Sequence, residues 1–269
     1  MLKSKLPPNA VVLWRGPSQI DGGPIVVIAT ALRTKSSNSK TGAMVQTYIL
    51  REDVDPVHAI TMGLDWSICG DCPHRAAKPL FIDLPAGSPE AKGLPRWESR
   101  SCYVNVGQGP LAVWRAYKRG NSTLHSVEQI ADFIGDRQLP VRLGTYGDPA
   151  AVPLWVWETL VSKAPRHTGY THQWRTCDPR FSSFLMASAD NSAEMVEAQA
   201  KGYRTFRVAR PGMDPLPGEV RCPASKEAGT LTDCSSCGLC AGSFADRPNP
   251  PKTVMITVHG IGAEAFAVN

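Results

Sequence analysis

The sequence predicts an α/β protein, and more specifically a partial (β/α) barrel with a small N-terminal antiparallel β-sheet and a C-terminal cysteine-rich metal-binding loop. Three observations lead to this prediction. Short β-branched runs fill the first fifty residues, strand-like and helix-like segments alternate from residue 109, and most of the eight cysteines fall into two groups. A chain of 269 residues, 42% of them hydrophobic, can bury a large core. We divide it into an N-terminal β-rich segment (1–64), a barrel-like core (65–215) and a cysteine-rich segment with a final strand (216–269).

The N-terminal segment reads as a small antiparallel sheet. Its expected strands are residues 10–14, 25–32 and 43–50, which are rich in Val, Ile and Leu and are separated by turn residues. The connection 33–42 is polar and basic. It is either a solvated hairpin tip or a phosphate-binding tip that uses Lys35 and Lys40, but it lacks the glycine pattern of a P-loop.

Helices and strands alternate in the rest of the chain. A proline in the first turn marks the helix that starts at Gly109, and Ser126 is a good N-cap for the next helix. Such alternation indicates βαβ units and a mostly parallel sheet or barrel. We expect helices at 109–119, 126–134, 150–163 and 192–201, and strands at 141–146, 168–174, 184–188, 203–208 and 253–258.

Polar side chains lie in or just after four of these strands. Ligands of parallel α/β proteins gather at the carboxyl ends of the strands, so these side chains are our candidate catalytic residues. The two aspartates also fit helix N-caps, and the histidine also fits a hydrogen-bonded core position. The candidates are Asp148, His172, Gln173, Asp190 and Arg207.

The C-terminal cysteine group is Cys222, Cys234, Cys237 and Cys240. Three of these cysteines follow one another at intervals of three residues, which is typical of iron–sulfur proteins, whereas structural zinc usually takes two separate C-x2-C pairs. The spacing favours an iron–sulfur cluster and leaves zinc as the alternative. Disulfides are the third interpretation, but closely spaced cysteines pair poorly and no export signal opens the chain.

The N-terminal cysteine group is Cys69, Cys72 and Cys102. Three protein ligands leave one coordination position for a substrate or cofactor, whereas a structural site would take a fourth ligand, for which His74 is the candidate. Buried free thiols are the alternative interpretation of this group, and the expected state of the isolated Cys177.

These motifs together resemble the radical-SAM-like iron–sulfur proteins, particularly the small versions that bacteriophages encode. The resemblance covers residues 65–258 and rests on the C-x2-C pair, the later Cys102-Tyr103, the strand end Gly144-Thr-Tyr-Gly-Asp-Pro149 and the final cysteine group. It implies a [4Fe–4S] cluster on Cys69, Cys72 and Cys102 that binds S-adenosylmethionine, and an auxiliary cluster on the C-terminal group. In that family the loop is C-x3-C-x2-C, whereas a long interval precedes Cys102 here.

Composition leaves a second function open. A net charge of +5 suits contact with a polyanion, so the alternative is a zinc-stapled nucleic-acid-binding protein of phage replication or host takeover. Its phosphate contacts would come from the basic hairpin 33–42 together with Arg115, Lys118 and Arg119. A degenerate barrel that serves as an inhibitor or scaffold is a third possibility.

Other classes of protein are not indicated. The sequence contains no nucleophile elbow and no dinucleotide-binding glycine turn, which argues against a serine hydrolase or a nicotinamide enzyme. Its longest apolar runs are too short to cross a bilayer, and we therefore expect a cytoplasmic protein without a membrane partner.

Overall fold

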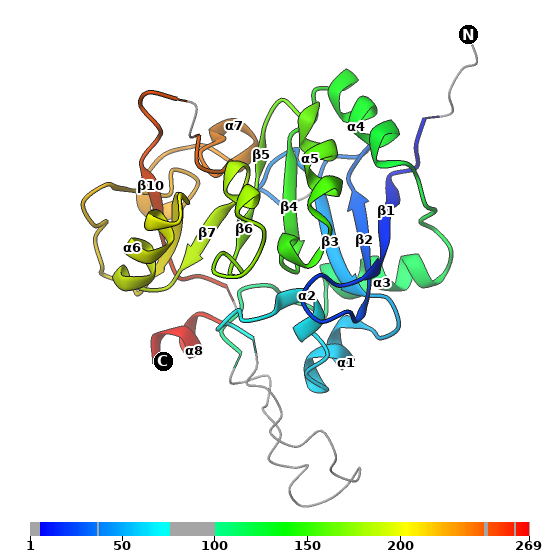
Figure 1. The fold of residues 1–269 in the computed structure, drawn as a ribbon, viewed down its shortest axis with the longest axis horizontal. Coiled ribbons are helices and arrows are strands. Elements are labelled where there is room, and N and C mark those ends of the chain that lie inside the picture. The colour runs from blue at the N-terminus through cyan, green and yellow to red at the C-terminus, as the bar shows by residue number, and fades with distance from the viewer. Residues whose placement is uncertain (1–5, 37, 76–99, 245–246, 261, 269) are drawn as a thin grey trace, which may run out of the picture.

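The computed structural model describes residues 6–36, 38–75, 100–244, 247–260 and 262–268. Two five-stranded sheets have the strand orders β1-β2-β3-β4-β5 and β6-β7-β8-β10-β9 (Figure 1). The strands are β1 (Ala10–Pro17), β2 (Pro24–Thr30), β3 (Val45–Arg51), β4 (Val141–Tyr146), β5 (His167–Thr168), β6 (Tyr170–Thr171), β7 (Met186–Ala189), β8 (Thr205–Ala209), β9 (Glu219–Arg221) and β10 (Thr253–Thr257). The mixed α/β class is thus confirmed, and the partial barrel stays a prediction.

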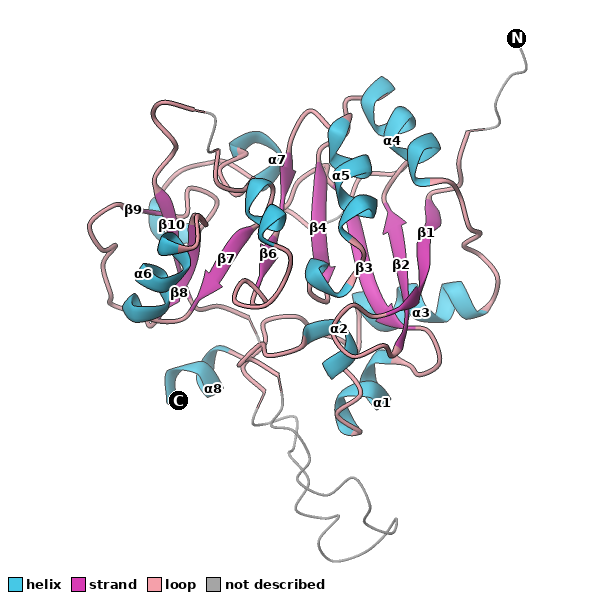
Figure 2. Ribbon diagram, in the orientation of Figure 1, coloured by secondary structure: helices cyan, strands magenta, loops and turns pink. Residues whose placement is uncertain are grey.

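Helices surround the sheets (Figure 2). The α-helices are α1 (Pro56–Thr61), α2 (Trp66–Cys69), α3 (Gly109–Lys118), α4 (Val127–Asp136), α5 (Leu154–Ser162), α6 (Ser192–Ala200), α7 (Cys234–Cys237) and α8 (Ala263–Val268). The described residues also include the short 3-10 helices η3 (Pro149–Ala151), η4 (Pro179–Ser183) and η5 (Lys226–Ala228). Within the described part of the chain, no helix has the length and apolar character needed to cross a membrane.

The first sheet joins the N-terminal segment to the following one. Strands β1, β2 and β3 pair antiparallel, which confirms the predicted antiparallel pairing. They do not form the separate small sheet that the sequence predicts, because they belong to a five-stranded sheet. Strand β3 then pairs parallel with β4, and β4 pairs parallel with β5. The N-terminal strands therefore share one sheet with the first strand of the barrel-like core.

The second sheet is entirely parallel, from β6 through β7, β8 and β10 to β9. Strand β10 lies between β8 and β9, so the cysteine-rich segment contributes two strands to the sheet. Parallel strands carry their carboxyl ends to one edge, and in Figure 1 the helices α2 and α8 lie along that edge.

Gly169 lies between β5 and β6 and therefore at the junction of the two sheets. Its amide donates a hydrogen bond to the carbonyl of Cys240 (3.1 Å), and its carbonyl accepts one from the amide of Met186 (3.0 Å). A Cβ atom at this position would lie 2.4 Å from Cδ2 of Leu185. Only glycine lets these segments approach so closely.

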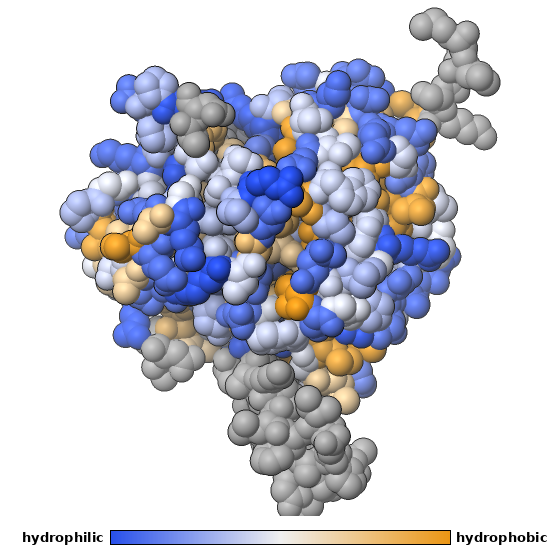
Figure 3. Space-filling model, in the orientation of Figure 1, coloured by the Kyte–Doolittle hydropathy of each residue, from blue (hydrophilic) through white to orange (hydrophobic). Residues whose placement is uncertain are grey.

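The largest hydrophobic core packs β1–β4 against α4 and α5. Helix α4 begins where the hydroxyl of Ser126 accepts a hydrogen bond from the amide of Gln129 (3.2 Å), so this cap is as predicted. Ile130 and Ile134, one turn apart, are both buried. On the face drawn in Figure 3, hydrophilic residues predominate and hydrophobic residues form separate spots.

The predicted elements differ from the observed ones mainly at their ends and in short segments. The expected strand 168–174 is broken at Gly169 and ends at Thr171, because the hydroxyl of Thr171 accepts a hydrogen bond from the amide of Gln173 (2.9 Å) and turns the chain. The expected helix 150–163 begins as the separate 3-10 turn η3. Single-turn helices such as α2 and α7 are too short to produce a hydrophobic period, so sequence analysis did not predict them.

Candidate metal centre

A cavity of about 520 Å³ lies between the two cysteine groups, and all seven of their cysteines line it. Polar and charged side chains from distant parts of the chain line it as well: Lys40, His74, Tyr103, Arg142, Tyr146, Asp148, His172 and His259. All eight cysteines of the protein are free thiols, so the disulfide interpretation is wrong. The two groups that the sequence suggested therefore belong to one cavity.

The N-terminal cysteine group is built around the end of helix α2. Cys69 is the last residue of the helix, and the amide of Cys72 donates a hydrogen bond to the carbonyl of Cys69 (3.2 Å) in the turn that follows. The amide of Cys102 donates to the carbonyl of His74 (3.0 Å). This bond brings Cys102 back to the C-x2-C turn despite the long interval in sequence.

Two side chains hold this turn in place. Arg75 donates to a carboxylate oxygen of Asp65 (2.6 Å), and both side chains are buried. Gln173 accepts from the amide of Asp71 (3.3 Å) and donates to the carbonyl of Cys69 (3.1 Å). Gln173, a predicted catalytic residue, therefore supports the cysteine turn from behind, and it is not among the residues that line the cavity.

Gly70 is required in this turn for two reasons. Its φ is +49°, and a Cβ atom on it would lie 2.4 Å from Oε1 of Gln173. We expect Gly70→Ala to lower the free energy of unfolding by about 2–3 kcal/mol, because backbone strain adds to the displacement of Gln173. Urea denaturation measures this change.

Gly120→Ala is the matched control, because Gly120 has a φ of +79° and a Cβ atom added there would meet no other atom within 4 Å. Backbone strain alone should cost about 1 kcal/mol there. The double variant Gly70→Ala/Gln173→Ala should recover part of the loss. Equal losses for Gly70→Ala and Gly120→Ala would contradict the role of Gln173.

The C-terminal cysteine group is held by the turn α7 and by the second sheet. Asp233 caps α7 by accepting a hydrogen bond from the amide of Ser236 (2.9 Å), which places Cys234 and Cys237 one helical turn apart. The amide of Cys222 donates to the carbonyl of Met255 in β10 (2.7 Å). The amide of Cys234 donates to the carbonyl of Lys40 (2.9 Å), which ties the group to the N-terminal segment.

The thiols of each group are close enough for their charges to interact. Burial raises the pKa of Cys69 well above its ordinary value, and the charges of Asp65, Cys72 and Cys102 raise it further. Burial likewise raises the pKa of Cys240 to about 12, to which the charges of the other three C-terminal cysteines contribute. Thiols in such surroundings become thiolates only where a cation stabilises them.

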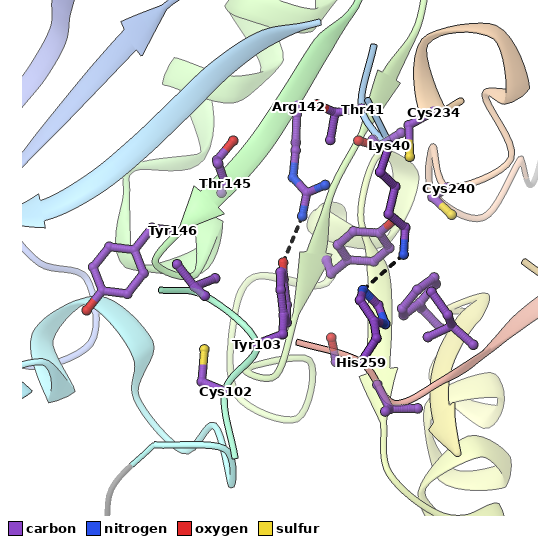
Figure 4. A pocket seen from close by; sticks show the side chains of 18 of the residues that line it. Lys40, Thr41, Cys102, Tyr103, Arg142, Thr145, Tyr146, Cys234, Cys240 and His259 are labelled. Atoms are coloured by element: carbon purple, nitrogen blue, oxygen red, sulfur yellow. Dashed lines mark hydrogen bonds between the residues drawn. The ribbon is translucent and has the colours of Figure 1, made fainter. Parts of the chain in front are cut away.

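Two cationic side chains lie between the cysteine groups in the view of Figure 4. Arg142, which is 8% exposed, donates to the hydroxyl of Tyr103 (2.7 Å), and its Nε has no hydrogen-bond partner. Nζ of Lys40 lies 3.0 Å from Nε2 of His259, and burial lowers the pKa of Lys40. Among the described residues, neither cation forms an ion pair with a carboxylate.

The candidate catalytic residues fall into separate environments. Asp148 and His172 line the cavity, and the carboxylate of Asp148 accepts from the amides of Ala150 (3.0 Å) and His172 (2.8 Å). Burial raises the pKa of Asp148 to about 6 and lowers that of His172 to about 4. Arg207 instead forms a buried two-point ion pair with Glu219 and does not line the cavity.

His74 and Asp190 lie beside His172. Nδ1 of His74 is 2.9 Å from the hydroxyl of Ser101, and its Nε2 is 2.9 Å from Oδ1 of Asp190. The cap of α6 is Asn191, so the carboxylate of Asp190 does not serve as the N-cap. Both ring nitrogens of His74 thus have partners other than the cysteines.

Sequence reasoning did not identify Arg142, Tyr103 or His259 as site residues. A signal existed for two of them: Arg142 is a charged residue inside a predicted strand, and His259 follows the carboxyl end of β10. Lys40 was expected at a hairpin tip but faces the cavity, whereas Lys35 is exposed.

Cys177 lies outside both groups, as expected, with its sulfur 3.4 Å from the hydroxyl of Tyr203. Burial raises its pKa to about 11. At pH 8 about one thiol in a thousand is then ionised, so iodoacetamide should label Cys177 slowly, and the rate should rise about tenfold per pH unit up to pH 10. Mass spectrometry of the native protein gives the rate, and a plateau below pH 9 would contradict this expectation.

Comparison with known proteins adds nothing to this picture: no protein-family model, no curated protein and no solved structure matches the chain. The functional argument therefore rests on the cavity and its residues.

Proposed function

We propose that this protein is an iron–sulfur enzyme resembling the radical SAM enzymes. In this proposal Cys69, Cys72 and Cys102 hold a cluster with one open coordination position, and Cys222, Cys234, Cys237 and Cys240 hold a second, auxiliary cluster. The observation that carries the proposal is that all seven cysteines line one cavity, which has room for a small molecule between the two groups.

The sulfur atoms of neither group are placed closely enough for three of them to bind one zinc ion. Thiolates around one zinc ion lie about 3.8 Å apart, given a Zn–S distance of about 2.3 Å and tetrahedral geometry. Among the described residues, which include all eight cysteines, no three sulfurs lie within 4.8 Å of one another. Thiolates of a four-iron cluster bind different irons at the corners of a cube and are farther apart.

The buried cations give separate support. A guanidinium or ammonium group loses its hydration on burial and needs a compensating negative charge. Arg142 and Lys40 are close enough to Cys234 to affect its pKa, which burial raises and the two cations lower. Cysteine thiolates bound to a metal would supply the negative charge that neither cation obtains from an ion pair with a carboxylate among the described residues.

The remaining residues would bind and orient the substrate. Tyr146 has a buried hydroxyl without a hydrogen-bond partner. Burial raises its pKa, and the charge of the nearby Cys69 raises it further. The hydroxyl therefore keeps its proton and can donate it toward the N-terminal group. Asp148 and His172 present a carboxyl and an imidazole to the same cavity. When bound, the cluster at the N-terminal group would supply one electron and an iron that chelates S-adenosylmethionine.

Purification without oxygen, followed by iron and sulfide analysis, tests the proposal. We expect about eight iron atoms and eight sulfides per chain, as for two four-iron clusters, together with charge-transfer absorption. Addition of S-adenosylmethionine should change the electron paramagnetic resonance spectrum of the reduced protein. A protein that takes up only zinc would overturn the proposal and favour the zinc-stapled alternative.

Two sets of variants separate the clusters. Alanine at Cys69, Cys72 and Cys102 should remove about half of the iron and the response to S-adenosylmethionine. Alanine at Cys234, Cys237 and Cys240 should remove the other half and keep the response. Cys177→Ala is the control and should keep both.

A further inference from the structure

We propose that His74, His172 and Asp190 form a binding site for a first-row divalent metal ion, separate from both cysteine groups. The side chains come from the cysteine turn, the end of β6 and the end of β7, so the fold brings together three distant segments of the chain. The proposal does not depend on whether the cysteines hold iron or zinc.

The three side chains have the spacing of metal ligands. One ligand atom from each lies within 4.8 Å of the other two. Nε2 of His74 is 2.9 Å from Oδ1 of Asp190, and Nε2 of His172 is 3.8 Å from Oδ2 of Asp190. Neighbouring ligand atoms on one Zn²⁺ or Fe²⁺ ion are about 3–3.5 Å apart, and the two measured separations bracket this range.

Two buried atoms in this group have no hydrogen-bond partner. They are Nε2 of His172 and Oδ2 of Asp190, which face each other across a gap too long for a hydrogen bond. Buried polar atoms are seldom left unpaired, because each costs about 1–3 kcal/mol. A cation between them would bind both atoms, whereas an ion pair between His74 and Asp190 alone would leave both unsatisfied.

Neighbouring residues orient two of the ligands. The hydroxyl of Ser101 lies 2.9 Å from Nδ1 of His74, which directs the other ring nitrogen toward Asp190. The carboxylate of Asp148 accepts from the main-chain amide of His172 (2.8 Å) and fixes that residue at the end of β6. The two imidazole rings meet edge to face, with centroids 5.4 Å apart. Such support is typical of metal ligands.

The ligand set defines the class of metal. Two imidazoles and one carboxylate suit Fe²⁺, Mn²⁺, Co²⁺ or Zn²⁺, and a softer thiolate-binding ion would prefer the cysteines. Three protein ligands leave further coordination positions open. Because His74 and His172 both line the cavity, a molecule in the cavity could reach the ion.

Titration with Mn²⁺ tests the proposal, because Mn²⁺ binds oxygen and nitrogen ligands in preference to thiolates. Free Mn²⁺ gives a strong electron paramagnetic resonance signal that is lost on binding. We expect one Mn²⁺ per chain, at least tenfold weaker binding in Asp190→Asn and in His172→Gln, and a Mn²⁺-dependent rise in melting temperature that both variants lack.

Control variants keep the result interpretable. His167→Gln alters a histidine outside the cavity, whose Nε2 lies 3.1 Å from the carbonyl of Phe184, and should bind Mn²⁺ as the parent protein does. Cys177→Ser, which alters a thiol outside both cysteine groups, should also bind normally. If Asp190→Asn does not fold, His172→Gln decides alone. Absence of stoichiometric binding, or binding that survives both site variants, would overturn the proposal.

Discussion

If the C-terminal group holds a metal, as proposed, Cys237→Ser should release it and lower the free energy of unfolding by more than about 4 kcal/mol. For a chain of this size that corresponds to a fall in melting temperature of about 8–16 °C. The reason is that Cys222, Cys234, Cys237 and Cys240 join α7, the second sheet and, through the carbonyl of Lys40, the N-terminal segment. Metal analysis and scanning calorimetry measure the two effects.

The control for this prediction is Cys177→Ser, which changes a thiol outside both groups and should keep the metal. Chelator-treated parent protein and chelator-treated Cys237→Ser should melt at nearly the same temperature, because both lack the metal. A variant that loses stability while keeping its full metal content would show that Cys237 acts by packing alone.

Arg142→Met should have opposite effects in the metal-loaded and metal-free protein. In the metal-loaded protein that we propose, the guanidinium would lie beside negatively charged sulfurs, and its loss should cost about 3–5 kcal/mol, as for a broken buried ion pair. In the metal-free protein the thiols are neutral, so a buried cation without an anionic partner is unfavourable, and methionine should be neutral or stabilising. Urea denaturation of both forms measures the difference.

Arg204→Met is the matched control, because Arg204 is also buried but donates to four main-chain carbonyls: those of Leu239, Gly242, Pro251 and Lys252. Its loss should destabilise both forms of the protein, because it removes four hydrogen bonds to main-chain carbonyls that do not depend on a metal. If Arg142→Met behaves in the same way as Arg204→Met, the charge argument for bound thiolates fails.

Much of the secondary structure is visible in the sequence because local signals agree there. The strand 141–146 is predicted to the residue, and a capping serine marks the start of the helix that follows Ser126. The junction at Gly169 is not predicted, because it depends on the backbone of Cys240, which is distant in sequence. Non-local contacts of this kind leave no periodic pattern.

The residues of the candidate site are likewise predicted where the signal is local and missed where the contact is distant in sequence. Spacing alone groups the cysteines, and the rule that ligands gather at strand ends selects Asp148, His172 and Asp190. The same rule also selects Arg207, whose partner Glu219 lies on a strand too short to be recognised. Nothing in the sequence indicates that His74 meets Asp190, because their contact exists only after the sheet has assembled.

The amide of Gly169 donates a hydrogen bond to the carbonyl of Cys240, so the exchange rate of this one amide reports on the C-terminal cysteine group. This amide lies where the two sheets join, so its solvent exchange depends on whether the cysteine segment stays docked. Deuterium uptake there should be slow while the C-terminal group is filled and should accelerate when a chelator empties it. The exchange rate of this one amide would then report whether the cysteine segment is docked against the junction of the two sheets.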